Sequence, residues 1–272
     1  MPVHIPSELY DHTLDFLHND RAALSACSVV CKAWLPSSRF HLFSNLHISD
    51  RSGPLLCKAL NIPGTTIPRR IHSIHFQFLS SAEEDRQKAL ACIKTLSNHF
   101  QRITGRLSIF AYAVSLDEFL CAAYPIEEGK EEGGLRDFGC VSLMNVRLHQ
   151  QLELNILASK SSSLRNMVLQ GVDFQGGIPS RSLVASSVMQ PANLGYLRRL
   201  ELGEMWPQGI VDWLKSHADC YDSIEELDVM LIHERDECVR EIISSCGAHL
   251  QRLKVTIGAQ VNGTLLDWIT SM

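Results

Sequence analysis

The sequence predicts an α/β protein in which a small all-helical module precedes a larger body of alternating strands and helices. Three observations lead to this prediction: helical spacing of apolar residues near the N-terminus, a strand-like pattern that recurs from residue 71 onward, and amphipathic segments between the recurrences. A chain of 272 residues is long enough for one small and one larger domain. We therefore expect a helical module over residues 1–50, a linker over residues 51–70 and a body over residues 71–272.

The N-terminal module is expected to contain three short helices. Pro6 can begin the first, and Glu8 follows in its first turn, where the helix dipole favours an acid. Asp20 can cap the second helix, and a third helical segment runs on from Trp34 with an expected interruption at Pro36. A module of this size buries too small a core to offset its chain entropy, so it should lean on a neighbour or a partner.

The residues of this module resemble those of an F-box. The resemblance is carried by Ile5-Pro6-x-Glu8-Leu9, by Leu14, Leu17 and Leu24, by Val30-Cys31-Lys32-x-Trp34, and by Leu42-Phe43-x-x-Leu46. Its most specific part is Val-Cys-Lys-x-Trp at the proper distance behind Ile-Pro-x-Glu-Leu. The chain departs from the family at Thr13, where a larger aliphatic residue is usual, and at Phe43, where Trp is usual.

The resemblance implies that the module binds the Skp-family adaptor of a cullin-RING ubiquitin ligase. The adaptor contacts that it implies, with Cys31 and Trp34 partly structural, are Pro6, Leu9, Leu14, Leu17, Leu24, Val30, Cys31 and Trp34. Apolar positions on a helix can serve internal packing, a partner surface or both. The resemblance also implies that the rest of the chain recruits a protein substrate, whose identity and binding residues the sequence does not reveal.

A pattern of the form apolar-x-x-apolar-x-apolar recurs along the body. It is found at Ile71/Ile74/Phe76, Leu135/Phe138/Cys140, Leu164/Met167/Leu169, Leu197/Leu200/Leu202, Ile224/Leu227/Val229 and Leu250/Leu253/Val255. The last four recurrences start 33, 27 and 26 residues apart. Strands and helices that alternate at this period are typical of a leucine-rich-repeat solenoid, in which parallel strands line one face and helices the other. We therefore expect an irregular, leucine-rich-repeat-like body, with a non-repetitive α/β domain as the alternative.

Helical segments are expected between these strands. They are Ala89/Ile93/Leu96/Phe100, Leu116/Phe119/Leu120/Ala123, Ile210/Trp213/Leu214 and Val239/Ile242/Ile243/Cys246. Capping boxes at Ser81-x-x-Glu84 and Ser115-x-x-Glu118 mark the expected starts of two helices, whereas the same box at Ser223-x-x-Glu226 falls in a predicted strand. The Asn or Cys that normally follows the strand of a leucine-rich repeat is missing, which is why we describe the body as irregular.

Composition and charge exclude several classes of function. The 25 Lys and Arg residues are outnumbered by 30 Asp and Glu residues, so the basic surface of a nucleic-acid binder is not expected. No apolar run reaches the roughly 18–20 residues of a membrane span, and the N-terminus lacks the pattern of a signal peptide. We therefore expect no nucleic-acid or membrane partner and a cytoplasmic or nuclear location, or both. The nine cysteines should then be thiols, with Cys27, Cys31, Cys140 and Cys246 in the core.

Motifs for catalysis or cofactor binding are missing from the sequence. Twelve histidines include no H-E-x-x-H pair, and His72 and His75 should lie on opposite faces of a strand. The chain has no G-x-S-x-G elbow, no phosphate-binding G-x-x-x-x-G-K-[ST] loop and no G-x-G-x-x-G fingerprint. We expect no catalytic residues, no cofactor and no metal.

These observations predict a substrate-recognition subunit of a Skp-cullin-F-box ubiquitin ligase, which binds the adaptor through the module and a substrate through the body. One alternative is a non-catalytic protein-binding scaffold that does not join a ligase. A second alternative is a hydrolase or transferase without a recognisable motif, which would need a deep polar pocket lined by converging titratable side chains.

Overall fold

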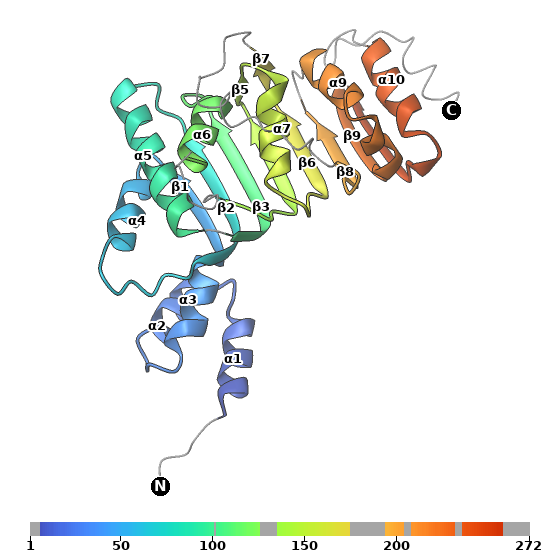
Figure 1. Cartoon of the computed structure of the whole chain (residues 1–272). Coiled ribbons are helices and arrows are strands. Elements are labelled where there is room, and N and C mark those ends of the chain that lie inside the picture. The colour runs from blue at the N-terminus through green and yellow to red at the C-terminus, as the bar shows by residue number, and fades with distance from the viewer. Residues whose placement is uncertain are drawn as a thin grey trace.

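The computed structural model describes residues 6–100, 102–125, 135–174, 194–203, 208–231 and 236–257. Figure 1 shows a large sheet with helices along one of its faces, and helices α1, α2 and α3 extend from its N-terminal end. Eight strands form the main sheet, and every pairing between them is parallel. The α/β class predicted from the sequence is therefore confirmed.

Three helices make up the N-terminal end: α1 (Ser7–Phe16), α2 (Arg21–Cys27) and α3 (Leu35–Ser44). Asp20 caps α2 as expected, because its carboxylate accepts the N–H of Ala23 at 2.9 Å. The expected interruption at Pro36 is wrong. Pro36 lies in the first turn of α3, where a missing N–H costs no helical hydrogen bond. Helix α3 packs against the first two strands of the sheet, so the helices do lean on a neighbour.

The strands of the main sheet lie side by side in their order along the chain. They are β1 (Asn45–Ser49), β2 (Arg70–Phe78), β3 (Arg102–Ala111), β4 (Cys140–Met144), β6 (Asn166–Gln170), β8 (Arg199–Leu202), β9 (Glu226–Leu231) and β10 (Arg252–Ile257). A second, two-stranded parallel sheet is formed by β5 (Arg147–Leu148) and β7 (Asp173–Phe174).

Helices lie in most of the described connections between strands of the main sheet. They are α4 (Ser52–Leu60), α5 (Glu83–His99), α6 (Leu116–Ala123), α7 (Gln151–Ser159), α9 (Gln208–Lys215) and α10 (Asp236–Cys246), with short 3₁₀ helices at Ala218–Ser223 and Gly247–His249. Connections between neighbouring parallel strands are right-handed almost without exception, so a sheet that always grows in one direction has its helices on one face. Figure 1 shows this arrangement, which leaves the other face of the sheet open.

The recurring apolar pattern forms continuous rows beneath the helices. One row runs through Ile74, Leu107, Val141, Met167, Leu200, Leu227 and Leu253, and the next through Phe76, Ile109, Leu143, Leu169, Leu202, Val229 and Val255. All of these side chains are buried except the two on β10, which are partly buried. Because each unit packs on the next, the core is continuous from β1 to α10.

Strands β3 and β4 do not follow the recurring apolar pattern as predicted. In β4 the residues in register with the rows are Val141 and Leu143, so the recurrence predicted at Leu135/Phe138/Cys140 is displaced by three residues. Cys140 is buried but alternates with the row residues, which places it on the opposite face. In β3 a bulge adds one residue between Ile103 and Leu107, which is why the pattern does not occur there.

The sheet begins earlier than the sequence suggests. Strand β1 lies within the predicted module of residues 1–50, and α4 occupies part of the predicted linker over residues 51–70. Leu46 and Ile48 of β1 are in register with Ile74 and Phe76, so β1 extends both apolar rows by one strand. The division of the chain into domains stays a prediction.

All four predicted helical segments form helices, but only one predicted capping box marks a helix start. Ser115 caps α6, as its hydroxyl accepts the N–H of Glu118 at 3.3 Å and the Glu118 carboxylate accepts the N–H of Ser115 at 3.0 Å. The box predicted at Ser81 is wrong, because Ala82 occupies the N-cap position of α5. Near the start of α5 it is the hydroxyl of Ser80 that makes a side-chain hydrogen bond, donating to Asp85 at 2.6 Å.

Candidate functional site

The predicted adaptor-contacting residues divide into an interior and an exposed group. Leu14 and Leu24 are completely buried, so they support the module from within and offer no surface to a partner, contrary to the prediction. Leu17 is half-buried, and so is Trp34, whose ring lies 6.2 Å from that of Tyr10. These four residues therefore serve, wholly or in part, the packing of the three helices.

The other predicted contacts are exposed. Leu9 is 59% exposed and Val30 63% exposed, and Pro6 and Cys31 are exposed as well. The prediction of Cys31 as a core residue is wrong, because α2 ends at Cys27 and Cys31 lies beyond it. Cys27 itself is half-buried.

The module has further exposed apolar side chains that are not among the predicted adaptor contacts. They are Phe16, Val29 and Phe40, which are 76%, 83% and 51% exposed. Together with Leu9 and Val30 they make up half of the ten large apolar side chains that are exposed among the described residues. Single exposed apolar residues are ordinary, but five of the ten lie on α1, on α3 or in the turn after α2, which makes this part of the chain a candidate interaction surface. We call these five residues and Pro6 the module surface.

Polar contacts fix the helix that carries much of the module surface. The hydroxyl of Ser37 on α3 donates to Asp11 of α1 at 2.5 Å. The Nε2 atom of His41, also on α3, lies 2.9 Å from the carboxylate of Asp15. Two such contacts, four residues apart on α1, hold α1 against α3 and so set the direction in which Leu9 points.

The open face of the sheet is the second candidate surface. At its N-terminal end the rings of His47 and His75 stack with centroids 4.9 Å apart. In its centre Ser108 and Ser142 lie side by side in register, each only 4% exposed. Beside them Phe110 packs edge-on against Tyr112, which is 55% exposed. Phe110 is the next-to-last residue of β3 and Tyr112 follows the end of that strand, so this aromatic pair lies at the carboxyl-terminal edge of the open face.

Charged side chains occupy the open face over β8, β9 and β10. Arg199 lies 3.6 Å from Glu226, which also pairs with Arg252 at 3.4 Å. Lys254 pairs with Asp228 at 2.6 Å. Glu201 of β8 is in register with Asp228 and lies 3.5 Å from Arg199. Three cations and three anions therefore occupy these strands, and this end of the face is charged but close to neutral.

A polar cavity of about 260 Å³ lies where β3 leads into α6, and its titratable lining makes it the candidate for a catalytic site. Its lining residues are Arg86, Ala113, Ser115, Asp117, Glu118, Arg147 and His149. Arg86 bridges Glu83 and Glu118. Ser115 is committed to capping α6, and the carboxylate that its hydroxyl contacts is paired with that arginine. A serine and a base held in this way stabilise a helix start and are poorly placed to form a nucleophile.

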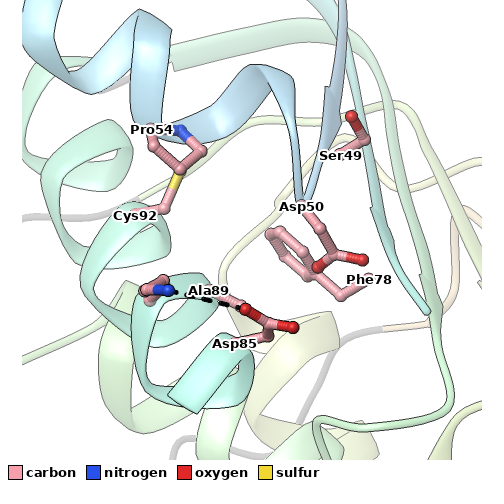
Figure 2. A pocket seen from close by; sticks show the side chains of 8 residues that line it. Ser49, Asp50, Pro54, Phe78, Asp85, Ala89 and Cys92 are labelled. Carbon is pink, nitrogen blue, oxygen red and sulfur yellow. Dashed lines mark ion pairs between the residues drawn. The ribbon is translucent and has the colours of Figure 1, made fainter. Parts of the chain in front are cut away.

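A second cavity, between α4, α5 and the ends of β1 and β2, is shown in Figure 2. It holds only about 10 Å³, the space of a single water molecule. Its lining residues are Ser49, Asp50, Pro54, Phe78, Asp85, Lys88, Ala89 and Cys92. Asp50 accepts the N–H groups of Leu79 at 3.0 Å and Ser80 at 3.3 Å, so its carboxylate ties down the end of β2. The cavity is too small for a substrate.

Among the described residues two acids are buried, Asp117 in the first turn of α6 and Glu153 at the start of α7, and Glu153 is the one with no exposed surface. Burial raises its pKa, while the N–H groups of His149 and Gln150, which the carboxylate accepts at 2.8 and 3.0 Å, oppose that effect. This arrangement completes a capping box on α7, so the buried acid has a structural role. Within the described residues, no three His, Cys, Asp or Glu side chains are grouped to hold a metal ion.

None of the helices that the structure describes is long and apolar enough to span a bilayer. No protein-family model matches the chain, and no curated protein matches it significantly. A functional assignment therefore rests on the motif residues near the N-terminus and on the two surfaces described above.

Proposed function

We propose that this protein is the substrate-recognition subunit of a Skp-cullin-F-box ubiquitin ligase, working in the cytoplasm, the nucleus or both. Helices α1–α3 bind the Skp-family adaptor through the module surface. The observation that carries the proposal is the coincidence of the F-box motif with exposed apolar side chains, since Leu9 and Val30 are motif residues and both are more than half exposed. Exposure of this kind on so small a module is expected of a partner surface.

We further propose that the strands and helices from β1 onward form a leucine-rich-repeat-like solenoid that binds the substrate. Three features support this: parallel strands in chain order, apolar rows in register, and helices on one face. The turns after β4 and β6 add a fourth, because Asn145 and Gly171 occupy equivalent places and both have positive φ, 53° and 60°. The open face, with Phe110 and Tyr112 at its carboxyl-terminal edge, is the proposed substrate surface.

The proposed mechanism is proximity. The chain itself performs no covalent step; it holds the substrate on the open face while the module surface attaches it to the ligase. A continuous sheet is a stiff connection between the two surfaces, and stiffness raises the effective concentration of the substrate near the ubiquitin-bearing enzyme.

A pull-down with a double variant tests the proposal. Pro6→Ala with Leu9→Ala should abolish co-purification with both adaptor and cullin, while thermal unfolding stays unchanged because both side chains are exposed. Leu55→Ala is the matched control, since Leu55 is 64% exposed but lies on α4, outside the module surface. A folded double variant that still captures the adaptor would contradict the proposal.

The same pull-down separates the two alternatives. A protein-binding scaffold that does not join a ligase shares every feature from β1 onward and would bring down no cullin. A hydrolase or transferase would bring down neither adaptor nor cullin. It would depend on the cavity lined by Arg86, in which Arg86 is already ion-paired with Glu83 and Glu118.

A further inference from the structure

Two cysteine sulfurs meet where α4 packs on α5. The Sγ atoms of Cys57 on α4 and Cys92 on α5 lie 3.3 Å apart, and both residues are free thiols. Gly53 makes this approach feasible, because a Cβ atom at that position would come within 2.8 Å of the Cys92 sulfur. Cys57 is half-buried and reaches solvent, whereas Cys92 is 4% exposed. The pair therefore combines one accessible and one enclosed thiol in contact.

We propose that Cys57 and Cys92 are a reversible oxidation site that forms a disulfide on reaction with a hydroperoxide. The Cys57 thiolate attacks one peroxide oxygen, the O–O bond breaks, and a sulfenic acid forms with release of water. The Cys92 sulfur then attacks the Cys57 sulfur, and the S–O bond breaks as the S–S bond forms. The departing hydroxide leaves as a second water with the Cys92 proton. Two thiols lose two electrons, and one peroxide is reduced to two waters.

Burial decides which thiol reacts first. It raises the pKa of Cys92, which keeps this group protonated and leaves the first attack on the peroxide to Cys57. The 3.3 Å contact between the two sulfurs makes Cys92 the resolving partner, which gives its proton to the departing oxygen as it attacks. Cys57 is the residue that solvent and a small oxidant can reach. Cys92 also lines the water-sized cavity of Figure 2, together with Pro54 of α4. That cavity can accept the water released when the Cys57–Cys92 disulfide forms between the packed helices α4 and α5.

The disulfide would tie the first helices of the main sheet together. It closes a loop over a sequence separation of 35 residues, which includes all of β2. A cross-link of this length restricts the unfolded chain and holds α4 on α5 in the folded one. Oxidation should therefore slow amide exchange along α4 and raise the temperature of unfolding by several degrees. Neither effect depends on the proposed ligase role.

The test uses the full chain, purified reduced and treated with hydrogen peroxide. We expect loss of two titratable thiols, a mass decrease of about 2 Da and a linked pair of peptides that contain Cys57 and Cys92. A thiol reductant should restore the free thiols and the original unfolding temperature. Folded protein that yields no Cys57–Cys92 peptide, or yields it only in denaturant, overturns the proposal.

Variants separate this site from general cysteine oxidation. Cys57→Ser should fold normally, lose the linked peptide and show no peroxide-dependent rise in unfolding temperature. Cys27→Ser is the control, because Cys27 is also half-buried but lies on α2, and it should behave like the parent protein. Cys92→Ala provides a second test, in which Cys57 should stop at the sulfenic acid and be trapped by a dimedone-type reagent. A linked peptide that persists at another pair in Cys57→Ser would contradict the assignment.

Discussion

His75, which lies on the open face, makes the stability of the fold depend on pH. Burial lowers the pKa of this histidine below 6.5, and the neighbouring charge of His47 lowers it further. The unfolded chain therefore binds a proton at a higher pH than the folded chain does. Stability from this group is complete above the unfolded pKa and is lost as pH falls through 6.5 toward the lower, folded value.

We therefore expect the free energy of unfolding to decrease between about pH 7.5 and pH 5.5, and His75→Gln to flatten that decrease. Urea titrations at several pH values measure it. His12→Gln is the control, because that ring lies exposed on α1. An unchanged pH dependence in His75→Gln would show that another group is responsible.

Gly105 is required by the bulge in β3. A Cβ atom there would lie 2.5 Å from the His72 ring and 2.7 Å from the His72 carbonyl oxygen, and the backbone oxygen cannot move without disturbing the strand pairing. Gly105→Ala should therefore destabilise the fold by about 1–3 kcal/mol, as overpacking usually does. Gly139→Ala is the matched control, since its Cβ would meet nothing closer than 3.7 Å. Equal urea midpoints for the two variants would be the contrary result.

At the scale of the element, the start of α6 depends on one side chain. Ser115 accepts a backbone N–H and is enclosed by the capping box with Glu118, so Ser115→Ala should cost about 1 kcal/mol of unfolding free energy. Ser81→Ala should change stability by less than about 0.5 kcal/mol, because Ser81 is exposed and Ala82 holds the cap position of α5. Denaturant unfolding of both variants checks the pair, and a larger loss in Ser81→Ala would refute the assignment of caps.

Strands can be predicted from the sequence where the spacing of apolar residues matches the residues that are buried. The prediction is wrong where a bulge or a short strand breaks that match. The strands β6, β8, β9 and β10 keep the same apolar spacing, so their register follows from the pattern. The bulge at Gly105 breaks that spacing in β3 without breaking the apolar rows. In β1 only Leu46 and Ile48 face the core, and two apolar residues are too few for a periodicity.

The module surface shows a different limit of sequence interpretation. Leu9 and Leu14 belong to the same motif, yet Leu9 is exposed and Leu14 is completely buried. Phe16 and Phe40 are outside the predicted set and are more than half exposed. Spacing places an apolar residue on a helix face, but only the packing of the three helices decides whether that face is covered.

At the scale of the molecule, the main sheet of the described residues grows in a single direction, so its stability depends on contacts between neighbouring strands and helices. Strand β1 is the first unit, and α3 continues directly into it. Leu46 and Ile48 are 7% and 1% exposed, and the whole of β1 is paired with β2. Removal of β1 would uncover the edge of β2 and the apolar side chains of Ile74 and Phe76, which β1 covers from the side.

Two fragments test whether the sheet begins at β1. The fragment of residues 45–272 keeps β1 and loses only the helices before it, so we expect it to fold and to unfold cooperatively. The fragment of residues 51–272 starts where the sequence prediction placed the end of the module, and it should unfold at a clearly lower urea concentration or aggregate through its uncovered edge. If the two fragments unfold at the same urea concentration, β1 contributes nothing to the sheet and the boundary near residue 50 is correct. A lower midpoint for the shorter fragment alone would place the first unit of the sheet at Asn45.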